Sequence, residues 1–189
     1  MLRANPLTTW AKNPDLPSIA PDAYVDETAV VIGAVKIESG VIVCPGAVLR
    51  ADEGFPIIIG AGSNIQDNVV IHALKGTAVE IGPRCSIAHG AIVHGPCTIG
   101  PDSFVGFQAI LLKTNIGKGC FIGHGAMVLN VDIPDGRYVP PGAIVKTADE
   151  VEKLGPVPQA LRAFAEEVLE VNKELVHGYR EIQAADGGS

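Results

Sequence analysis

An aliphatic residue recurs at every sixth position through the middle of this chain of 189 residues. The uninterrupted positions are Ile81, Ile87, Val93, Ile99, Val105 and Leu111. A hexapeptide period is typical of stacked coils, because each repeat can bury its one aliphatic side chain only against the coils above and below it. The pattern therefore predicts a mainly β fold, a coiled stack of short parallel strands.

The same period extends toward both ends and predicts the domain organisation. With three hexads to a coil, the aliphatic positions from Val25 to Val145 make about seven coils. We expect an extended, proline-rich segment over residues 1–23 and the β-helix over residues 24–147. The period shifts at 51–58 and at 73–80, where we expect the extra residues to bulge out as loops.

A helix is expected after the coils, over residues 157–182. Apolar residues recur there at steps of three and four, which is typical of an amphipathic helix that packs along the prism. They are Leu161, Phe164, Val168, Val171, Leu175 and Tyr179.

Charge and cysteine usage exclude several classes of protein. The net charge of −7 opposes binding to nucleic acid or to an anionic membrane. The chain has no apolar run long enough to cross a bilayer and no basic leader, so we expect a cytoplasmic protein. Three of the four cysteines, Cys85, Cys97 and Cys120, stand where other repeats carry Ala or Ser, and we expect them to be small buried side chains rather than zinc ligands.

Assigning the hexads to faces predicts a column of outward-pointing side chains. If the two loops leave the count of faces unchanged, the residues that follow the aliphatic positions of one face are Arg50, His72, His94 and Leu112. Coils stack about 4.8 Å apart, so His72 and His94 could both reach one metal ion. They form half of a metal site.

A third histidine, His89, belongs to a corner of the preceding face, in a column with Asp67. The faces of a three-sided prism diverge, so His89 is not expected to reach an ion held by His72 and His94 of its own chain. A neighbouring chain related by a three-fold axis could supply it, which predicts a homotrimer with metal sites between subunits. His124 lies in the same column beyond Phe107, about 10 Å from His89, and is expected to be a surface residue.

Three histidine ligands leave one coordination position open, which is typical of a catalytic rather than a structural ion. Such an ion supplies hydroxide near neutral pH by lowering the pKa of bound water. We expect Gln66 to orient that hydroxide and Glu53 to accept a proton from the water. Asn64 and Asp67 are expected to hold Gln66 and its loop in place.

Four segments carry a resemblance to a known family. They are RADEGFPIIIGAGSNIQDNVVIHAL (50–74), SIAHGAIVHGP (86–96), PDGRYVPPGAIV (134–145) and VNKELVHGY (171–179). Together they resemble the gamma-class carbonic anhydrases, including the amino-terminal domain of the carboxysome scaffold protein. The resemblance implies a left-handed parallel β-helix that forms trimers with zinc, or ferrous iron or cobalt, bound between subunits.

The resemblance also implies roles for individual residues. It matches His72, His89 and His94 to the metal ligands, with His89 donated by the adjacent subunit. It matches Gln66 to the glutamine that orients the hydroxide, with Asn64 as its support, and Glu53 to the active-site glutamate. The pair Arg50 and Asp52 resembles an inter-subunit salt bridge, with Asp67 as a further partner of the arginine. Asn172 resembles an asparagine near bound bicarbonate.

One segment departs from the family's pattern. The best-known members carry a long acidic loop between the first two ligands, with a glutamate that passes protons to solvent. Only residues 73–80 fill that space here, with Lys75 at the tip. The chain therefore resembles the subclass that lacks this loop.

The function expected from the residues and the resemblance is the reversible hydration of carbon dioxide to bicarbonate by a metal-bound hydroxide at a trimer interface. The carbon dioxide is expected in an apolar recess lined by Phe107 or Leu112. Two alternatives stay open: a hexapeptide acyltransferase that uses a histidine as general base toward an acyl-CoA, and a non-catalytic scaffold that keeps the fold.

Overall fold

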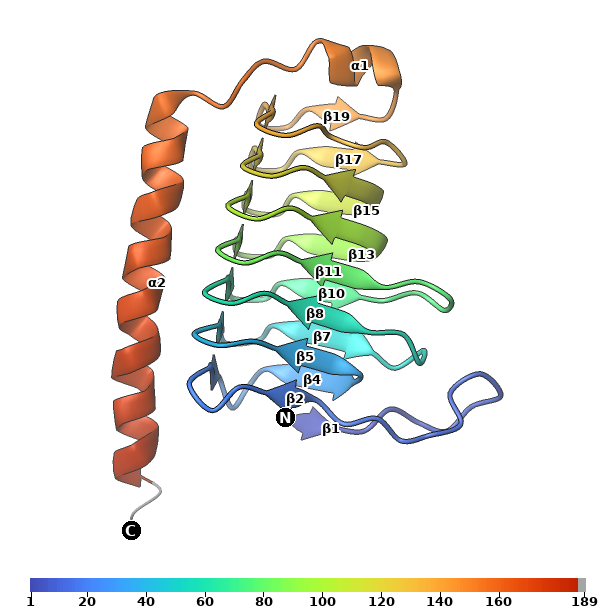
Figure 1. Ribbon diagram of the computed structural model, residues 1–189, viewed down its shortest axis with the longest axis vertical. Coiled ribbons are helices and arrows are strands. Elements are labelled where there is room, and N and C mark those ends of the chain that lie inside the picture. The colour runs from blue at the N-terminus through green and yellow to red at the C-terminus, as the bar shows by residue number, and fades with distance from the viewer. Residues whose placement is uncertain (187–189) are drawn as a thin grey trace.

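The computed structural model describes residues 1–186 and has the form of a three-sided prism with a long helix beside it (Figure 1). All strand pairings within the two sheets are parallel. Each strand pairs with its counterpart one coil away, seventeen to twenty-two residues along the chain, except that β1 and β4 are twenty-nine residues apart. The predicted coiled stack of about seven turns is confirmed.

The strands form three faces, which we call A, B and C. Face A contains β1 (Leu2–Arg3), β4 (Val30–Gly33), β7 (Val48–Ala51), β10 (Val70–His72), β17 (Met127–Leu129) and β19 (Ile144–Val145). Face B contains β2 (Ser18–Ile19), β5 (Val35–Ile37), β8 (Ile57–Ile59) and β11 (Val79–Ile81). Two longer strands, β13 (Ile92–Ile99) and β15 (Ile110–Ile116), turn the corner between A and B and belong to both faces.

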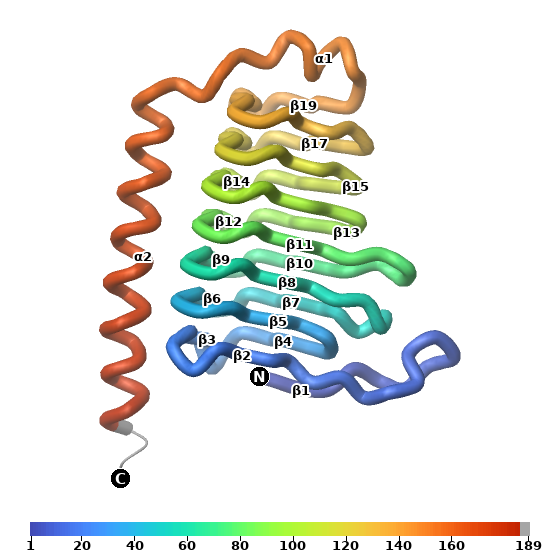
Figure 2. Tube along the Cα trace, in the orientation of Figure 1, coloured from blue at the N-terminus to red at the C-terminus, as the bar shows by residue number. Residues whose placement is uncertain are grey.

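Face C is a separate seven-stranded sheet, and Figure 2 labels its strands β3, β6, β9, β12 and β14. It contains β3 (Tyr24–Val25), β6 (Ile42–Val43), β9 (Asn64–Ile65), β12 (Ser86–Ile87), β14 (Phe104–Val105), β16 (Phe121–Ile122) and β18 (Tyr138–Val139).

The aliphatic positions of the hexads form the core of the prism. All of them from Val31 to Val145 are buried, whereas Val25 in the first coil is half-buried. Because each inward side chain packs against its counterparts above and below, the core grows with every coil and needs no helix for closure.

Loops leave the prism at the corner between faces A and B. Residues 52–56 and 73–78 are the two predicted bulges, and residues 4–17 make a third excursion between β1 and β2. Figure 2 shows all three on the same side of the stack, to the right. Residues 1–23, expected to be extended, thus include two short strands that add to faces A and B.

A corner of face C repeats the same backbone turn in successive coils. From Val43 onward, the third residue after each inward aliphatic of this face has a positive φ, at Gly46, Asn68, Gly90, Gln108, Gly125 and Gly142. Glycine adopts this conformation without a steric cost, and asparagine tolerates it better than most residues. The residues just before these positions therefore stand in one column with similar backbone geometry.

Cysteine and serine share a second column inside the prism. Ser63 and Ser103 donate hydrogen bonds to the carbonyls of Gly82 and Gly117, over 2.9 and 3.0 Å, and the Cys85 thiol donates to that of Gly100 over 3.2 Å. Cys120 makes the equivalent contact with Pro134. The cysteines are free thiols, and burial raises the pKa of Cys85 to about 12, so it stays protonated. These cysteines are buried as expected, and they also link neighbouring coils.

Two helices follow the coils. The short α1 (Ala148–Glu152) begins with a capping box between Thr147 and Glu150 and covers the carboxyl end of the stack. The long α2 (Gln159–Asp186) runs back along face C and contacts β3, β6 and β12. Within residues 1–186, no helix is both long and apolar enough to cross a membrane.

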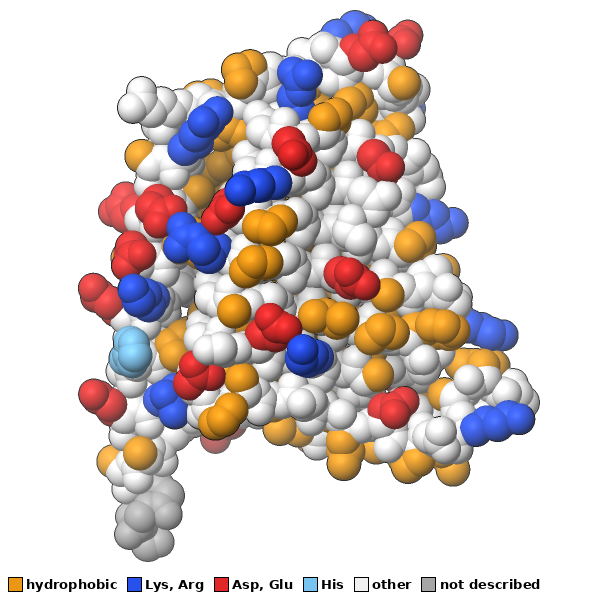
Figure 3. All heavy atoms as spheres, in the orientation of Figure 1, with side chains coloured by type: hydrophobic (Ala, Val, Ile, Leu, Met, Phe, Trp, Pro, Cys, Tyr) orange, Lys and Arg blue, Asp and Glu red, His pale blue; other side chains and the backbone are white. Residues whose placement is uncertain are grey.

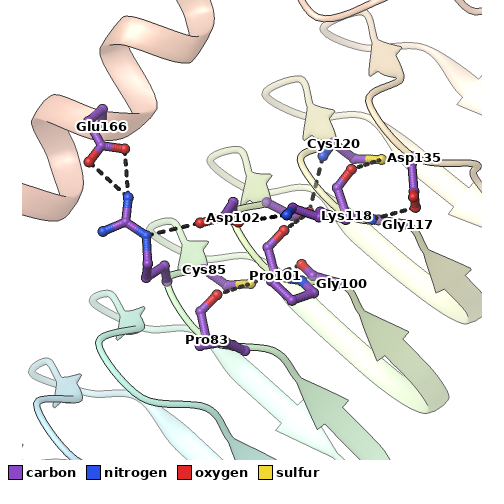
Figure 4. A network of polar contacts seen from close by, with 12 residues as sticks. Pro83, Cys85, Gly100, Pro101, Asp102, Gly117, Lys118, Cys120, Asp135 and Glu166 are labelled. Carbon is purple, nitrogen blue, oxygen red and sulfur yellow. Dashed lines mark hydrogen bonds and ion pairs between the residues drawn. The ribbon is translucent and has the colours of Figure 1, made fainter.

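An ion-pair network fastens α2 to the coils (Figure 4). The Arg84 guanidinium donates to both carboxylate oxygens of Glu166 on α2, each over 2.8 Å, and to Asp102 over 2.9 Å. Lys118 lies 3.8 Å from the other oxygen of Asp102. Figure 3 shows the wider setting, with charged side chains of both signs gathered over α2 and the neighbouring coil corners.

The face of α2 that packs on the prism includes part of the predicted stripe, because Leu161 and Val168 pack against the buried cluster around Phe104. Leu169 and Val176 are its most buried side chains. Four residues of the stripe are only partly covered: Phe164, which lies against Phe104, Tyr179, which stacks on Tyr24, and Val171 and Leu175. The apolar arc of α2 is wider than one chain covers, and half of it faces outward.

The core predicts an unequal response to two matched substitutions. Ile59→Ala in β8 removes a fully buried side chain and should lower the free energy of unfolding by about 2–5 kcal/mol. Ile144→Ala in β19 removes a side chain that is 52% exposed and should change it by less than about 1 kcal/mol. Urea titration of both variants checks this, and equal losses would contradict the assignment of the core.

Candidate metal centre

Two histidines stand in register on face A. His72 in β10 pairs with His94 in β13, and the same column contains Arg50 on one side and Leu112 on the other. The predicted column is therefore confirmed. The two loops leave the prism and return to it without changing the face on which the next hexad falls.

The two imidazoles direct ring nitrogens at one another. His72 Nδ1 lies 3.2 Å from His94 Nε2, and the rings meet edge to face. Two nitrogens bound to one tetrahedral zinc at about 2.1 Å would lie about 3.4 Å apart. His94 Nδ1 lies 3.1 Å from the Gly95 carbonyl oxygen, which orients the ring and leaves Nε2 toward His72. The pair fits two ligands of one ion.

Carboxylates from the loop 52–56 surround the other edge of His72. Its Nε2 lies 3.3 Å from Glu53 Oε1 and 3.7 Å from Asp52 Oδ1, and it is buried without a hydrogen bond. Burial is the main cause that lowers the pKa of His72, with a smaller contribution from the charge of Arg50. The imidazole is thus kept neutral, which is the form that binds a metal.

Glu53 is held by the neighbouring loop. Its Oε2 accepts a hydrogen bond from the backbone N–H of Lys75 over 2.5 Å. The Lys75 ammonium lies over the ring of Trp10, 4.7 Å from its centre. The three excursions at this corner therefore meet beside the histidine pair.

A second group of predicted residues lies on face C. The Gln66 side chain is buried and donates through Nε2 to Asn64 Oδ1 over 3.0 Å, and Asn64 donates in turn to Ser86 Oγ over 2.8 Å. Gln66 Oε1 is buried and accepts no hydrogen bond. A fixed amide with a free acceptor oxygen suits a ligand that carries a hydroxyl group.

His89 belongs to this second group. Its Nδ1 lies 2.7 Å from Asp67 Oδ2, and its side chain is 55% exposed. A pocket of about 440 Å³ opens between this corner and α2. Its lining includes Gln66, His89, Phe107 and Asn172.

The described residues 1–186 contain no group of three His, Cys, Asp or Glu side chains placed to hold a metal. His72 and His94 stand on face A, whereas His89, Gln66 and Asn172 line the pocket by face C. One chain thus carries two separate groups of candidate residues.

The charged residues expected at a subunit interface pair within the chain. Arg50 Nε donates to Asp52 over 3.1 Å, with the arginine side chain 46% exposed. Within the chain, Asp67 contacts His89 rather than Gln66, and its pairing with Arg50 of another subunit stays a prediction. Asn172 Nδ2 donates to the Val168 carbonyl of its own helix over 2.8 Å, which leaves Oδ1 toward other partners.

Three contacts were not anticipated from the sequence. Ser86 accepts a hydrogen bond from Asn64, and the sequence could have indicated this contact because the two residues occupy equivalent positions in adjacent coils. The backbone N–H of Lys75 holds Glu53, which no residue type could reveal. Phe107 stacks on His124 with ring centres 4.3 Å apart, so His124 is tied to the column of His89.

Comparison with known proteins identifies relatives of the whole chain. No family model matches the chain. It is 41% identical to the carbonic anhydrase of Methanosarcina thermophila, over 95% of this chain and 81% of that protein. It is 37% identical to the carboxysome assembly protein CcmM of Nostoc sp., over 97% of this chain but only 34% of that longer protein.

Solved structures share the fold. A hexapeptide transferase family protein from Anaplasma phagocytophilum aligns over 87% of this chain and 93% of its own with 26% identity and a TM-score of 0.74. A putative acetyltransferase from Bacillus cereus, 24% identical, aligns over 89% of this chain and 94% of its own with a TM-score of 0.78. The identity and coverage shared with the Methanosarcina protein show the family, and the chain belongs to the gamma-class carbonic anhydrases.

Proposed function

We propose that this chain catalyses the reversible hydration of carbon dioxide to bicarbonate in a homotrimer, with each metal ion held by His72 and His94 of one subunit and His89 of the next. The observation that carries the proposal is the division of the candidate residues into two incomplete groups on different parts of one chain. One group supplies two histidine ligands, and the other supplies the third histidine together with Gln66.

The donor set suits a divalent first-row ion. Neutral imidazoles bind zinc, ferrous iron and cobalt, and three of them leave a position for water or substrate. When bound, such an ion lowers the pKa of water to about 7 and so supplies a nucleophile at neutral pH. The facing nitrogens of His72 and His94 are where this chain would hold it.

A ring of subunits is the simplest way to join the groups. An interface between two different surfaces closes into a ring when the rotation is a fraction of a full turn, and three subunits give three equal sites. The exposed apolar half of α2, with Phe164, Val171 and Leu175, supports such an interface, since it borders the pocket that contains His89.

Gln66 and Asn64 would set the orientation of the attacking oxygen. Asn64 occupies the amide nitrogen of Gln66, so only Oε1 faces the reactants, as an acceptor. An acceptor takes the hydroxyl proton in a hydrogen bond and turns the oxygen lone pair toward the carbon of carbon dioxide. Because the amide is neutral, it does not compete for the ion.

Glu53 would remove the proton that each cycle releases. Its carboxylate stands at the edge of His72, on a loop that reaches solvent, and the Lys75 N–H fixes one of its oxygens. The other oxygen, which lies 3.3 Å from His72 Nε2, would accept the proton and pass it to water or buffer.

The remaining residues suit the substrate and product. Phe107 lines the pocket and Leu112 follows His94 on face A, so apolar surface borders both groups. Carbon dioxide needs no hydrogen bond there. Asn172 offers an amide from α2 to the more polar bicarbonate.

A scaffold without catalysis is the second candidate function. The similarity to CcmM, a carboxysome assembly protein by name, extends over nearly the whole of this chain and favours it. Metal binding without any hydration activity in the wild-type trimer would favour the scaffold function over carbon dioxide hydration.

Mixing two inactive variants tests the shared site. His72→Ala disables one group and His89→Ala the other, so each homotrimer should lose metal and more than about 100-fold in kcat/KM. Trimers reassembled from equal amounts should regain about a quarter of wild-type activity, because each mixed ring has one intact site. Stopped-flow hydration and elemental analysis of anaerobically prepared protein measure both.

The matched control is His177→Ala, on the exposed side of α2. It should leave metal content and rate unchanged. If the two inactive variants regain nothing on mixing, although sedimentation shows mixed trimers, all three ligands come from one chain and the proposal is wrong.

Glu53→Gln tests the proton step. The variant should keep its metal and lose about 10²-fold in kcat at low buffer concentration, with a smaller loss in kcat/KM, because proton release follows the hydration step. Added imidazole buffer should restore kcat. Lys75→Ala, which keeps the backbone N–H, is the control, and an unchanged kcat in Glu53→Gln would exclude Glu53 as the proton acceptor.

A further inference from the structure

We propose that Asp67, Phe107 and His124 form a column that presets the tautomer and the ring orientation of His89, so that the ligand donated to the neighbour is ready before the subunits meet. This inference rests on the proposed function for its purpose, but its geometry belongs to one chain. Asp67, Phe107 and His124 are positioning residues here, since none of them reaches the metal position.

The four side chains occupy equivalent places in four successive coils. The strands that precede them, β9, β12, β14 and β16, pair without a shift in register. Each of the four residues is followed by one with positive φ. The backbone is also joined from coil to coil: Gly90 N donates to Asp67 O over 2.9 Å, and Gln108 N to His89 O over 2.9 Å.

Asp67 decides which nitrogen of His89 carries the proton. A carboxylate only accepts hydrogen bonds, so the contact of 2.7 Å requires a proton on Nδ1. The lone pair is then on Nε2, at the far side of the ring from Asp67. A carboxylate behind a histidine ligand fixes its tautomer and raises its basicity in many metal sites.

Phe107 limits how the His89 ring can turn. Its ring lies above that of His89, with centres 5.3 Å apart and planes inclined by 34°. Asp67 therefore holds the ring by its edge and Phe107 packs on its face. Fixing the ring in one chain reduces the conformational entropy that metal binding would otherwise cost.

His124 holds Phe107 in turn. The two rings stack 4.3 Å apart at 14°, and the backbone N–H of Phe107 donates to His124 Nδ1 over 3.0 Å. Gly106 permits this approach, because a Cβ there would lie 2.8 Å from His124 Nδ1. The column thus ends in a histidine whose proton is on Nε2 and which binds backbone rather than metal.

The tautomer of His89 can be read without any metal. Proton–nitrogen correlation NMR of the metal-free trimer should place the imidazole proton of His89 on Nδ1 in the wild type. In Asp67→Ala the preference for this tautomer should be lost. Cobalt affinity, from competition with a chelator, should fall about 10–100-fold in Asp67→Ala. Asp67→Asn keeps an acceptor oxygen and should recover part of the loss. Asp132→Ala, an exposed carboxylate bonded to Asn115, is the matched control and should change neither measurement.

The possible results distinguish this proposal from an interface role for Asp67 and from a failure of the proposed function. A wild-type His89 with its proton on Nε2, or Asp67→Ala with unchanged tautomer and cobalt affinity, would overturn it. If Asp67→Ala dissociates into monomers while the His89 tautomer is unchanged, the role of Asp67 is a salt bridge to Arg50 of the adjacent subunit, and the proposal is wrong. Wild-type protein that shows the expected tautomer but binds no metal would defeat the proposed function and leave the column in place.

Discussion

Parallel hydrogen bonding between each coil and the next is the interaction on which the rest of this structure depends. It places every residue directly above its counterpart, about one strand spacing away. Side chains far apart in the sequence therefore become columns, and chemistry appears where a column repeats a useful residue type. His72 and His94 face one another for this reason, and so do Asp67, His89, Phe107 and His124.

The two columns lie on different parts of the prism, so under the proposed function a single chain holds two halves of a site. The half on face C contains a buried polar atom without a hydrogen bond, Gln66 Oε1. An unpaired buried polar atom costs about 1–3 kcal/mol. Such a cost is typical of residues selected for a ligand rather than for the stability of the isolated fold. The exposed apolar half of α2 has the same character, since it gains stability only when another surface covers it.

Much of the fold and part of the site could be predicted from the residues. The six-residue period placed the column from Arg50 to Leu112, and the structure has that register. The contact between Gln66 and Asn64 was also expected. One expectation was met only in part: α2 packs through Leu169 and Val176 as well as through members of the predicted stripe, of which Val171 and Leu175 are exposed. The helix presents apolar residues over a wide arc, and periodicity alone does not say which part of the arc one chain covers.

What the sequence determined by itself is local and repetitive: the coils, the inward aliphatic residues, and the alignment of His72 with His94, because a fixed period dictates which residues stack. The tertiary structure decided what depends on distant segments meeting. The loop at Lys75 reaches Glu53, the ion pair of Arg84 with Glu166 sets α2 against face C, and the corner turn brings Asp67 to the edge of His89. Such contacts follow from the direction in which corners and loops project, and no repeat in the sequence encodes that direction.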